Sequence, residues 1–202
     1  MIHFNDFLDT TLKALLDRVF SQYECEEQLQ KLIDACDFPV TDACRCAVDI
    51  YRVGNYISKQ QAFSDKRRVI SKLAYLQRFI SNCEIFFSAD IADGLFVVHG
   101  LGTVIGPRVR SGKNLTIYQN CTLGAQYDTA HSNPTLGDDV IVYAGAKVIG
   151  GINVGKNAVI GANSVVTKDV PSGAIVVGIP ARVIGYREVL NDDKYKLPPC
   201  VR

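Results

Sequence analysis

The chain has 202 residues, long enough for one or two domains with a real hydrophobic core. Its 22 basic and 21 acidic residues nearly cancel, so charge alone gives no general attraction to nucleic acid or to an anionic membrane. The opening MIHFNDFLDTTLK carries acidic residues and no basic segment before an apolar core, and no apolar run is long enough to span a bilayer. We therefore expect no signal peptide and no membrane insertion. The seven cysteines include no Cys-x-x-Cys pair, which favours reduced thiols and a cytoplasmic protein.

Residues 1–83 are predicted to form an N-terminal α-helical domain. Glycine is almost absent there, Gly54 being the one example, and apolar residues recur at helical spacing, as in FNDFLDTTLKALLDRVF. Thr41 and Ser64 are the expected N-caps of two of the helices. Further helices are expected over 26–36, 41–59 and 62–82.

Beyond residue 84 the apolar pattern repeats every six residues. Written in sixes from Leu136, the chain reads LGDDVI, VYAGAK, VIGGIN, VGKNAV, IGANSV, VTKDVP, with an aliphatic residue at every first position. Earlier blocks keep the pattern less cleanly, and those that begin at Ile91 and Val97 are offset by two residues. Because one six-residue unit cannot bury its apolar positions alone, the repeat predicts stacked coils of three short strands each. Corner asparagines suit the left-handed backbone that tight turns need, and we assign this role to Asn114, Asn157 and Asn163.

These hexapeptides resemble the bacterial hexapeptide-transferase family, and VPSGAIVVGIPARVIG (170–185) resembles its closing segment. Within that family the closest similarity is to the serine acetyltransferases, which AVDIYRVGNYI (47–57) also resembles. The resemblance implies a mainly β fold, a left-handed parallel β-helix over residues 84–187 followed by a tail at 188–202. It also implies an acetyl-CoA-dependent O-acetyltransferase that needs no metal and forms a homotrimer, with a dimer of trimers left open.

His99, in LFVVHGLGTVIG, is the expected general base, because the stretch is similar to the Asp-His-x-x-Gly motif of the serine acetyltransferases. By the same resemblance Glu84 is the acidic residue that orients the base. A carboxylate that accepts from one ring N–H fixes the tautomer, and an ordinary imidazole pKa of about 6.5 suits removal of a hydroxyl proton. The alternative is a corner histidine satisfied by a backbone carbonyl. His131, in the loop YDTAHSNPTLG, matches a second family histidine only after a gap, so a catalytic contact and a solvated loop residue both stay open.

Two departures from the serine enzymes bear on the acceptor. Val98 stands where they have an acid, and Ala130 where they have an arginine. Because a buried zwitterion without counter-charges is costly, we expect a sugar hydroxyl in surface-polysaccharide synthesis as the acceptor. Serine stays open, since Arg108, Arg110 or Asp49 could supply the charge.

The resemblance also implies where acetyl-CoA binds, in a groove between adjacent coils of two subunits. Backbone groups at Gly124 or Ala125 are expected to stabilise the oxyanion. Lys168 and Arg182 are expected to contact phosphates. The full set of expected donor contacts is Gly124, Ala125, Gly145, Ala162, Lys168 and Arg182. The alternative is that the small residues only serve the turns and that the basic residues are solvated.

Two other classes of protein with this fold are alternatives to the acetyltransferase. A metal-dependent carbonic anhydrase on this fold needs three histidines per zinc, two of them close in sequence. This chain has three histidines in all, and His99 and His131 lie 32 residues apart. The spacing therefore disfavours a zinc-dependent carbonic anhydrase. A non-catalytic trimeric scaffold is the other alternative.

Overall fold

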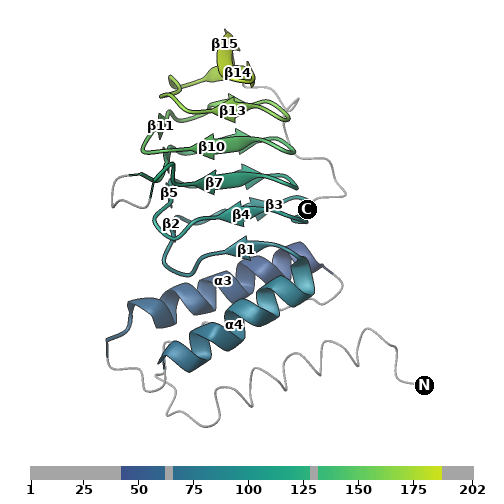
Figure 1. Ribbon diagram of the computed structural model, residues 1–202, viewed down its shortest axis with the longest axis vertical. Coiled ribbons are helices and arrows are strands. Elements are labelled where there is room, and N and C mark those ends of the chain that lie inside the picture. The colour runs from purple at the N-terminus through teal and green to yellow at the C-terminus, as the bar shows by residue number, and fades with distance from the viewer. Residues whose placement is uncertain (1–41, 62–65, 128–131, 188–202) are drawn as a thin grey trace, which may run out of the picture.

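The computed structural model describes residues 42–61, 66–127 and 132–187. The helices expected before residue 37, the cap expected at Ser64, and His131 with Ala130 lie outside these ranges. Figure 1 shows a pair of helices at one end of a stack of short strands, with the last two strands at the far end.

The helix pair consists of α3 (Ala43–Lys59) and α4 (Lys66–Ser81). The N-cap of α3 is Asp42, whose carboxylate accepts from the backbone N–H groups of Cys44 at 3.1 Å and Arg45 at 3.0 Å. The expectation of a cap at Thr41 is therefore wrong, because the helix begins one residue later and the aspartate carboxylate satisfies its first N–H groups. None of the helices in the described ranges combines the length and apolar character that crossing a bilayer requires.

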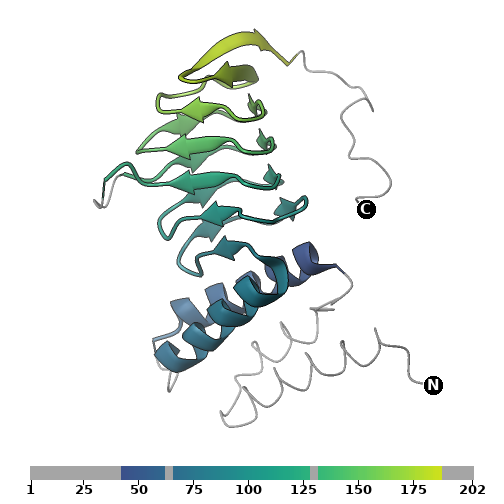
Figure 2. The ribbon, with the colours of Figure 1, turned by 45° about the vertical axis from the view of Figure 1, so that its right-hand side comes forward.

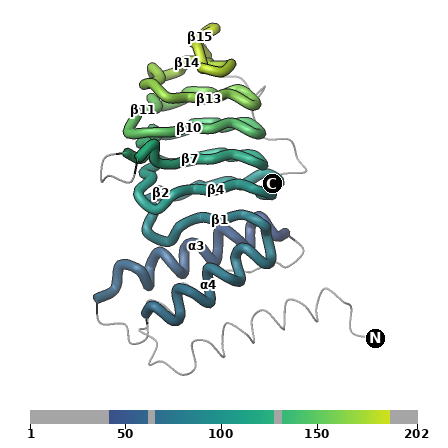
Figure 3. The backbone as a smooth tube through the Cα atoms, viewed as in Figure 1, coloured from purple at the N-terminus to yellow at the C-terminus, as the bar shows by residue number. Residues whose placement is uncertain are grey.

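The stack is a parallel β-helix of three sheets, and Figure 3 shows its backbone winding continuously upward from α4. Sheet A contains β1 (Glu84–Ile85), β4 (Val104–Ile105), β7 (Thr122–Gly124), β10 (Lys147–Ile149) and β13 (Val165–Val166). Sheet B contains β2 (Asp90–Ile91), β5 (Arg110–Ser111), β8 (Thr135–Leu136) and β11 (Asn153–Val154). Sheet C contains β3 (Phe96–Val97), β6 (Thr116–Ile117), β9 (Ile141–Val142), β12 (Val159–Ile160), β14 (Ala174–Gly178) and β15 (Ala181–Tyr186).

The six-residue period places one aliphatic side chain of each strand in a column inside the coils. In sheet A the column is Ile85, Ile105, Leu123, Val148 and Val166, every one at most 2% exposed. The expected corner asparagines adopt the left-handed conformation, with φ of 59° at Asn114, 59° at Asn157 and 55° at Asn163. Each coil therefore buries apolar surface only against its neighbours, as a solenoid must.

Both ends of the β-helix are covered (Figure 2). At the first coil, Tyr51 Oη of α3 donates to Ala89 O at 3.0 Å and accepts from Ile91 N–H at 3.2 Å, and Gln77 Oε1 of α4 accepts from Ile85 N–H at 2.8 Å. At the last coil, β15 pairs antiparallel with β14. These contacts satisfy backbone groups that an open sheet edge would expose.

Candidate functional site

His99 lies on the corner that joins β3 to β4, here termed the His99 corner (residues 98–103). The equivalent corners above it, 118–121, 143–146 and 161–164, have four residues each, so this corner is two residues longer. The extra length explains the two-residue offset of the earlier repeat blocks. His99 has a φ of 53°, and its side chain is exposed, whereas Val98 is only 6% exposed. The longer corner thus turns the imidazole outward from the coil.

Backbone and side-chain hydrogen bonds hold the His99 corner between the end of α4 and the coil above. Gly102 N–H donates to Asn82 O, just after α4, at 2.8 Å, and Asn120 N–H donates to Leu101 O at 2.8 Å from the coil above. The buried Thr103 donates through Oγ1 to Tyr118 O at 2.7 Å. The imidazole is therefore mounted on rigid backbone, which a general base requires.

Helix α3 also contacts this corner. Gly100 N–H donates to Cys44 Sγ at 3.2 Å, so the first turn of the helix is tied to the residue directly after His99. The buried thiol of Cys83 also lies near Gly100, and its burial raises its pKa to about 11. Cys83 is consequently a neutral packing residue at neutral pH. The sequence pattern gave no signal for Cys44, because it lies 56 residues from Gly100.

Glu84, the expected orienting residue, begins β1 beside the His99 corner, where its N–H donates to Thr103 O at 2.9 Å. Its carboxylate accepts from Arg78 Nη1 of α4 at 2.7 Å, and in the ranges described it makes no hydrogen bond with His99. The structure thus places Glu84 beside the His99 corner and pairs it with a cation. Its orienting role stays a prediction.

Two aromatic rings stand above the His99 corner. Tyr118 and Tyr143 occupy the corner position of Val98 in the next two coils, and their ring centroids are 5.0 Å apart. Burial, and then the neighbouring Tyr143, raise the pKa of the Tyr118 phenol. Pairing of β6 with β9, Ile117 opposite Val142, sets these two residues in register across the loop that interrupts the six-residue period.

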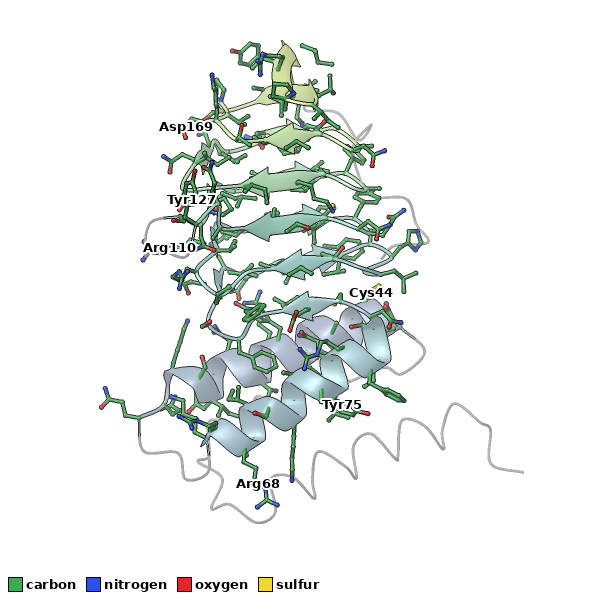
Figure 4. All side chains as sticks on the ribbon, viewed as in Figure 1. Cys44, Arg68, Tyr75, Arg110, Tyr127 and Asp169 are labelled. Atoms are coloured by element: carbon green, nitrogen blue, oxygen red, sulfur yellow. The ribbon has the colours of Figure 1, made fainter. Side chains whose placement is uncertain are left out.

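Five of the six expected donor contacts fall on two different edges of the three-sided stack, and Arg182 lies in β15. Gly145 and Ala162 lie on the edge between sheets C and A, termed the C–A edge, which also carries His99. Gly124, Ala125 and Lys168 lie where sheet A leads into sheet B, termed the A–B edge. In Figure 4, Tyr127, Arg110 and Asp169 lie along one side of the stack and Cys44 lies toward the other. A single chain therefore does not bring all the expected residues together.

Lys168 and Arg182, the two expected phosphate contacts, do lie close together. Both line a hollow of about 290 Å³ near the last coil, to which Thr167 and Asp169 also contribute. Two cationic side chains at one hollow suit an anionic group.

Comparisons with known proteins bear on the family and the fold. Residues 133–168 match the bacterial transferase hexapeptide (six repeats) family. The chain is 39% identical over 154 residues to the serine acetyltransferase of Staphylococcus aureus, an alignment that covers 74% of this chain and 72% of that enzyme. It is 40% identical over 137 residues to the Staphylococcus xylosus serine acetyltransferase, an alignment that covers 67% of this chain and 63% of that enzyme.

A solved structure gives the same result. The serine acetyltransferase of Brucella abortus in complex with coenzyme A is similar with a TM-score of 0.67 at 30% identity, covering 72% of this chain and 57% of that chain. The comparisons favour the serine alternative over the sugar acceptor expected from Val98 and Ala130, and they give no support to a role in polysaccharide synthesis. The expected left-handed parallel β-helix is confirmed, and the chain belongs to the serine acetyltransferase family of hexapeptide-repeat acyltransferases.

Proposed function

We propose that this protein transfers the acetyl group of acetyl-CoA to the hydroxyl of serine. The observation that carries the proposal is the 39% identity over 154 residues to a serine acetyltransferase, an alignment that reaches most of both chains. The exposed imidazole of His99 on a braced corner supports it, because acyl transfer to a hydroxyl needs a base that the substrate can reach.

In the proposed mechanism, acetyl-CoA supplies an activated acetyl group as its thioester. His99 accepts the proton of the serine hydroxyl as the oxygen attacks, and the imidazolium then returns a proton to the departing sulfur. Glu84 is the proposed positioning residue for the imidazole. A backbone N–H near Gly124 or Ala125 is proposed to stabilise the oxyanion. His131 keeps its proposed place near the reaction centre, although it lies outside the described residues.

We further propose that the complete site forms between two copies of the chain. Gly145 and Ala162 share the C–A edge with His99, while Gly124, Ala125 and Lys168 lie on the A–B edge. If all of them contact one acetyl-CoA molecule, the C–A edge of one copy must face the A–B edge of the next. A closed homotrimer satisfies this requirement at every interface, and two trimers could pair through further contacts.

The test is release of free coenzyme A from acetyl-CoA in the presence of L-serine or a panel of sugars and nucleotide sugars. Wild-type protein should turn over serine, and His99→Ala should lower kcat/KM by about 10²- to 10⁴-fold, the usual contribution of a general base. Lys113→Ala, an exposed change on the corner between β5 and β6, is the matched control and should leave kcat/KM unchanged.

Other outcomes identify the alternatives. Turnover of a sugar but not of serine would overturn the proposed acceptor while keeping the enzyme class. Absence of both turnover and coenzyme A binding would favour the scaffold.

A further inference from the structure

Two stacked tyrosine rings, termed the tyrosine pair (Tyr118 and Tyr143), lie on the same edge of the stack as His99. They stand one and two coils above Val98, and their ring centroids are 5.0 Å apart with 29° between the ring planes. Both side chains are half-buried, so part of each ring remains in contact with solvent. Because stacked rings at this separation stabilise each other, the pair presents one continuous aromatic surface above the His99 corner.

The backbone of each tyrosine is fixed by a buried side chain from the coil below. Thr103 Oγ1, in the His99 corner, donates to Tyr118 O at 2.7 Å, and Cys121 Sγ donates to Tyr143 O at 3.1 Å. Both donors are 0% exposed, and burial raises the pKa of the Cys121 thiol, so it is protonated at neutral pH. Because the first of these bonds joins Tyr118 to the His99 corner, the ring and the imidazole stand on one braced piece of backbone.

The tyrosine pair lies between His99 and two of the expected donor contacts. Gly145 shares the corner of the upper ring, and Ala162 lies on the next corner up. In that next corner Gly161 takes the position of the rings, so the aromatic surface ends there. A thioester that runs along the C–A edge toward the base therefore passes both rings. Because neighbouring coils are only about 4.8 Å apart, the ring of Tyr118 borders an acyl group that reacts at the His99 corner.

We propose that Tyr118, supported by Tyr143, is a specificity-determining residue that limits the acyl group of the donor to two carbons. The proposal rests on the proposed function and specifies its donor. A neutral ring offers apolar contact to the methyl of an acetyl group, and moving the ring aside for a longer chain would break the stack. One surplus methylene in an apolar site changes the rate about 10- to 200-fold. The stacked pair therefore turns a small difference in chain length into a preference for acetyl-CoA.

The test compares release of coenzyme A from acetyl-CoA, propionyl-CoA and butyryl-CoA with L-serine as acceptor. Wild-type protein should prefer acetyl-CoA to propionyl-CoA in kcat/KM by about 10- to 200-fold. Tyr118→Ala should lower that ratio about tenfold or more, because it opens room beside the acyl group. Tyr118→Phe should keep the wild-type ratio, since it keeps the ring. An unchanged ratio in Tyr118→Ala would overturn the proposal, as would an equal fall of the ratio in Tyr118→Phe.

Tyr75→Ala is the matched control. Tyr75 stacks on Phe79 with 6.1 Å between ring centroids, is 62% exposed, and lies on the side of α4 away from the coils in Figure 4. It should leave the acetyl-to-propionyl ratio unchanged. Tyr118→Leu, which keeps an apolar side chain but removes the ring, replaces Tyr118→Ala if that variant does not fold. A changed oligomeric state with an unchanged ratio would assign the pair to a contact between subunits and overturn the proposal.

A binding measurement distinguishes failure of this inference from failure of the proposed function. If serine is not turned over, the affinities of acetyl-CoA and butyryl-CoA are measured by isothermal titration calorimetry without an acceptor. Tighter binding of acetyl-CoA by the wild type, with the difference lost in Tyr118→Ala, would support the role of the ring although serine is not the acceptor. Equal affinities in the wild type would then overturn the role of the ring. Binding of neither thioester would overturn both this inference and the proposed function.

Discussion

Gly102→Ala tests whether the His99 corner must keep its present backbone path. Gly102 has a φ of 69°, and a Cβ built on it would lie 2.4 Å from Asn120 Oδ1 in the coil above. That distance is too short for any real contact, so the corner, the Asn120 side chain or both must move. His99 lies three residues away on the same corner and would move with it.

Two effects of the Gly102→Ala change lower the free energy of unfolding. Left-handed backbone costs a residue with a side chain about 1–2 kcal/mol relative to glycine, and the displacement of Asn120 brings the expected loss to about 2–3 kcal/mol. Activity should fall as well, even in the folded fraction, because misplacing a reactive group by about 1 Å can cost roughly 100-fold. We therefore expect kcat/KM with serine to fall about 100-fold in a protein that remains folded.

Two glycines at the far end of the β-helix provide controls. Gly173→Ala carries the same backbone strain, with a φ of 71°, but its Cβ would meet nothing closer than Arg187 O at 3.7 Å. Gly185→Ala would meet nothing within 4 Å. Guanidinium chloride unfolding should give a loss of about 1–2 kcal/mol for Gly173→Ala and almost none for Gly185→Ala. Both should retain wild-type kcat/KM in the coenzyme A release assay.

One result would refute the reasoning. If Gly102→Ala loses the expected stability and yet keeps the kcat/KM of Gly173→Ala, the geometry of this corner does not control the reaction, and His99 is not held there for catalysis.

Three further predictions concern the surroundings of this corner. Thr103→Val removes the bond from Oγ1 to Tyr118 O at 2.7 Å, so it should cost about 1–3 kcal/mol in denaturant unfolding, and a loss under 0.5 kcal/mol would contradict the bracing role. Because burial raises the pKa of Cys83 from 9.0 to about 11, the unfolded chain loses this proton first as the pH rises. The free energy of unfolding should therefore fall by about 2 kcal/mol between pH 9 and pH 11, and Cys83→Ala should remove that part of the decline. Glu84→Gln and Arg78→Gln both break an ion pair that is half exposed, so each should change stability by less than about 1 kcal/mol. Only Glu84→Gln should lower kcat/KM by about tenfold or more, and equal effects of the two would show that Glu84 acts only through the ion pair.

The repeat and its consequences could be predicted from the sequence because they are local. Each six-residue unit specifies its own inward aliphatic residue and its own corner, so the columns and the left-handed corners at Asn114, Asn157 and Asn163 follow without knowledge of the rest of the chain. The boundaries of α3 followed nearly as well, and its expected N-cap was wrong by one residue, since Thr41 and Asp42 both suit an N-cap. The candidate base His99 was found by the motif around it.

The placement of the site depends on tertiary structure. Only the stacked coils show that Gly124 and Gly145 lie on different edges and that Cys44 binds the residue after His99. The physical reason is that these relations join residues from different coils or elements. They depend on how many residues each corner holds and on where α3 docks, and a six-residue period carries no information about either.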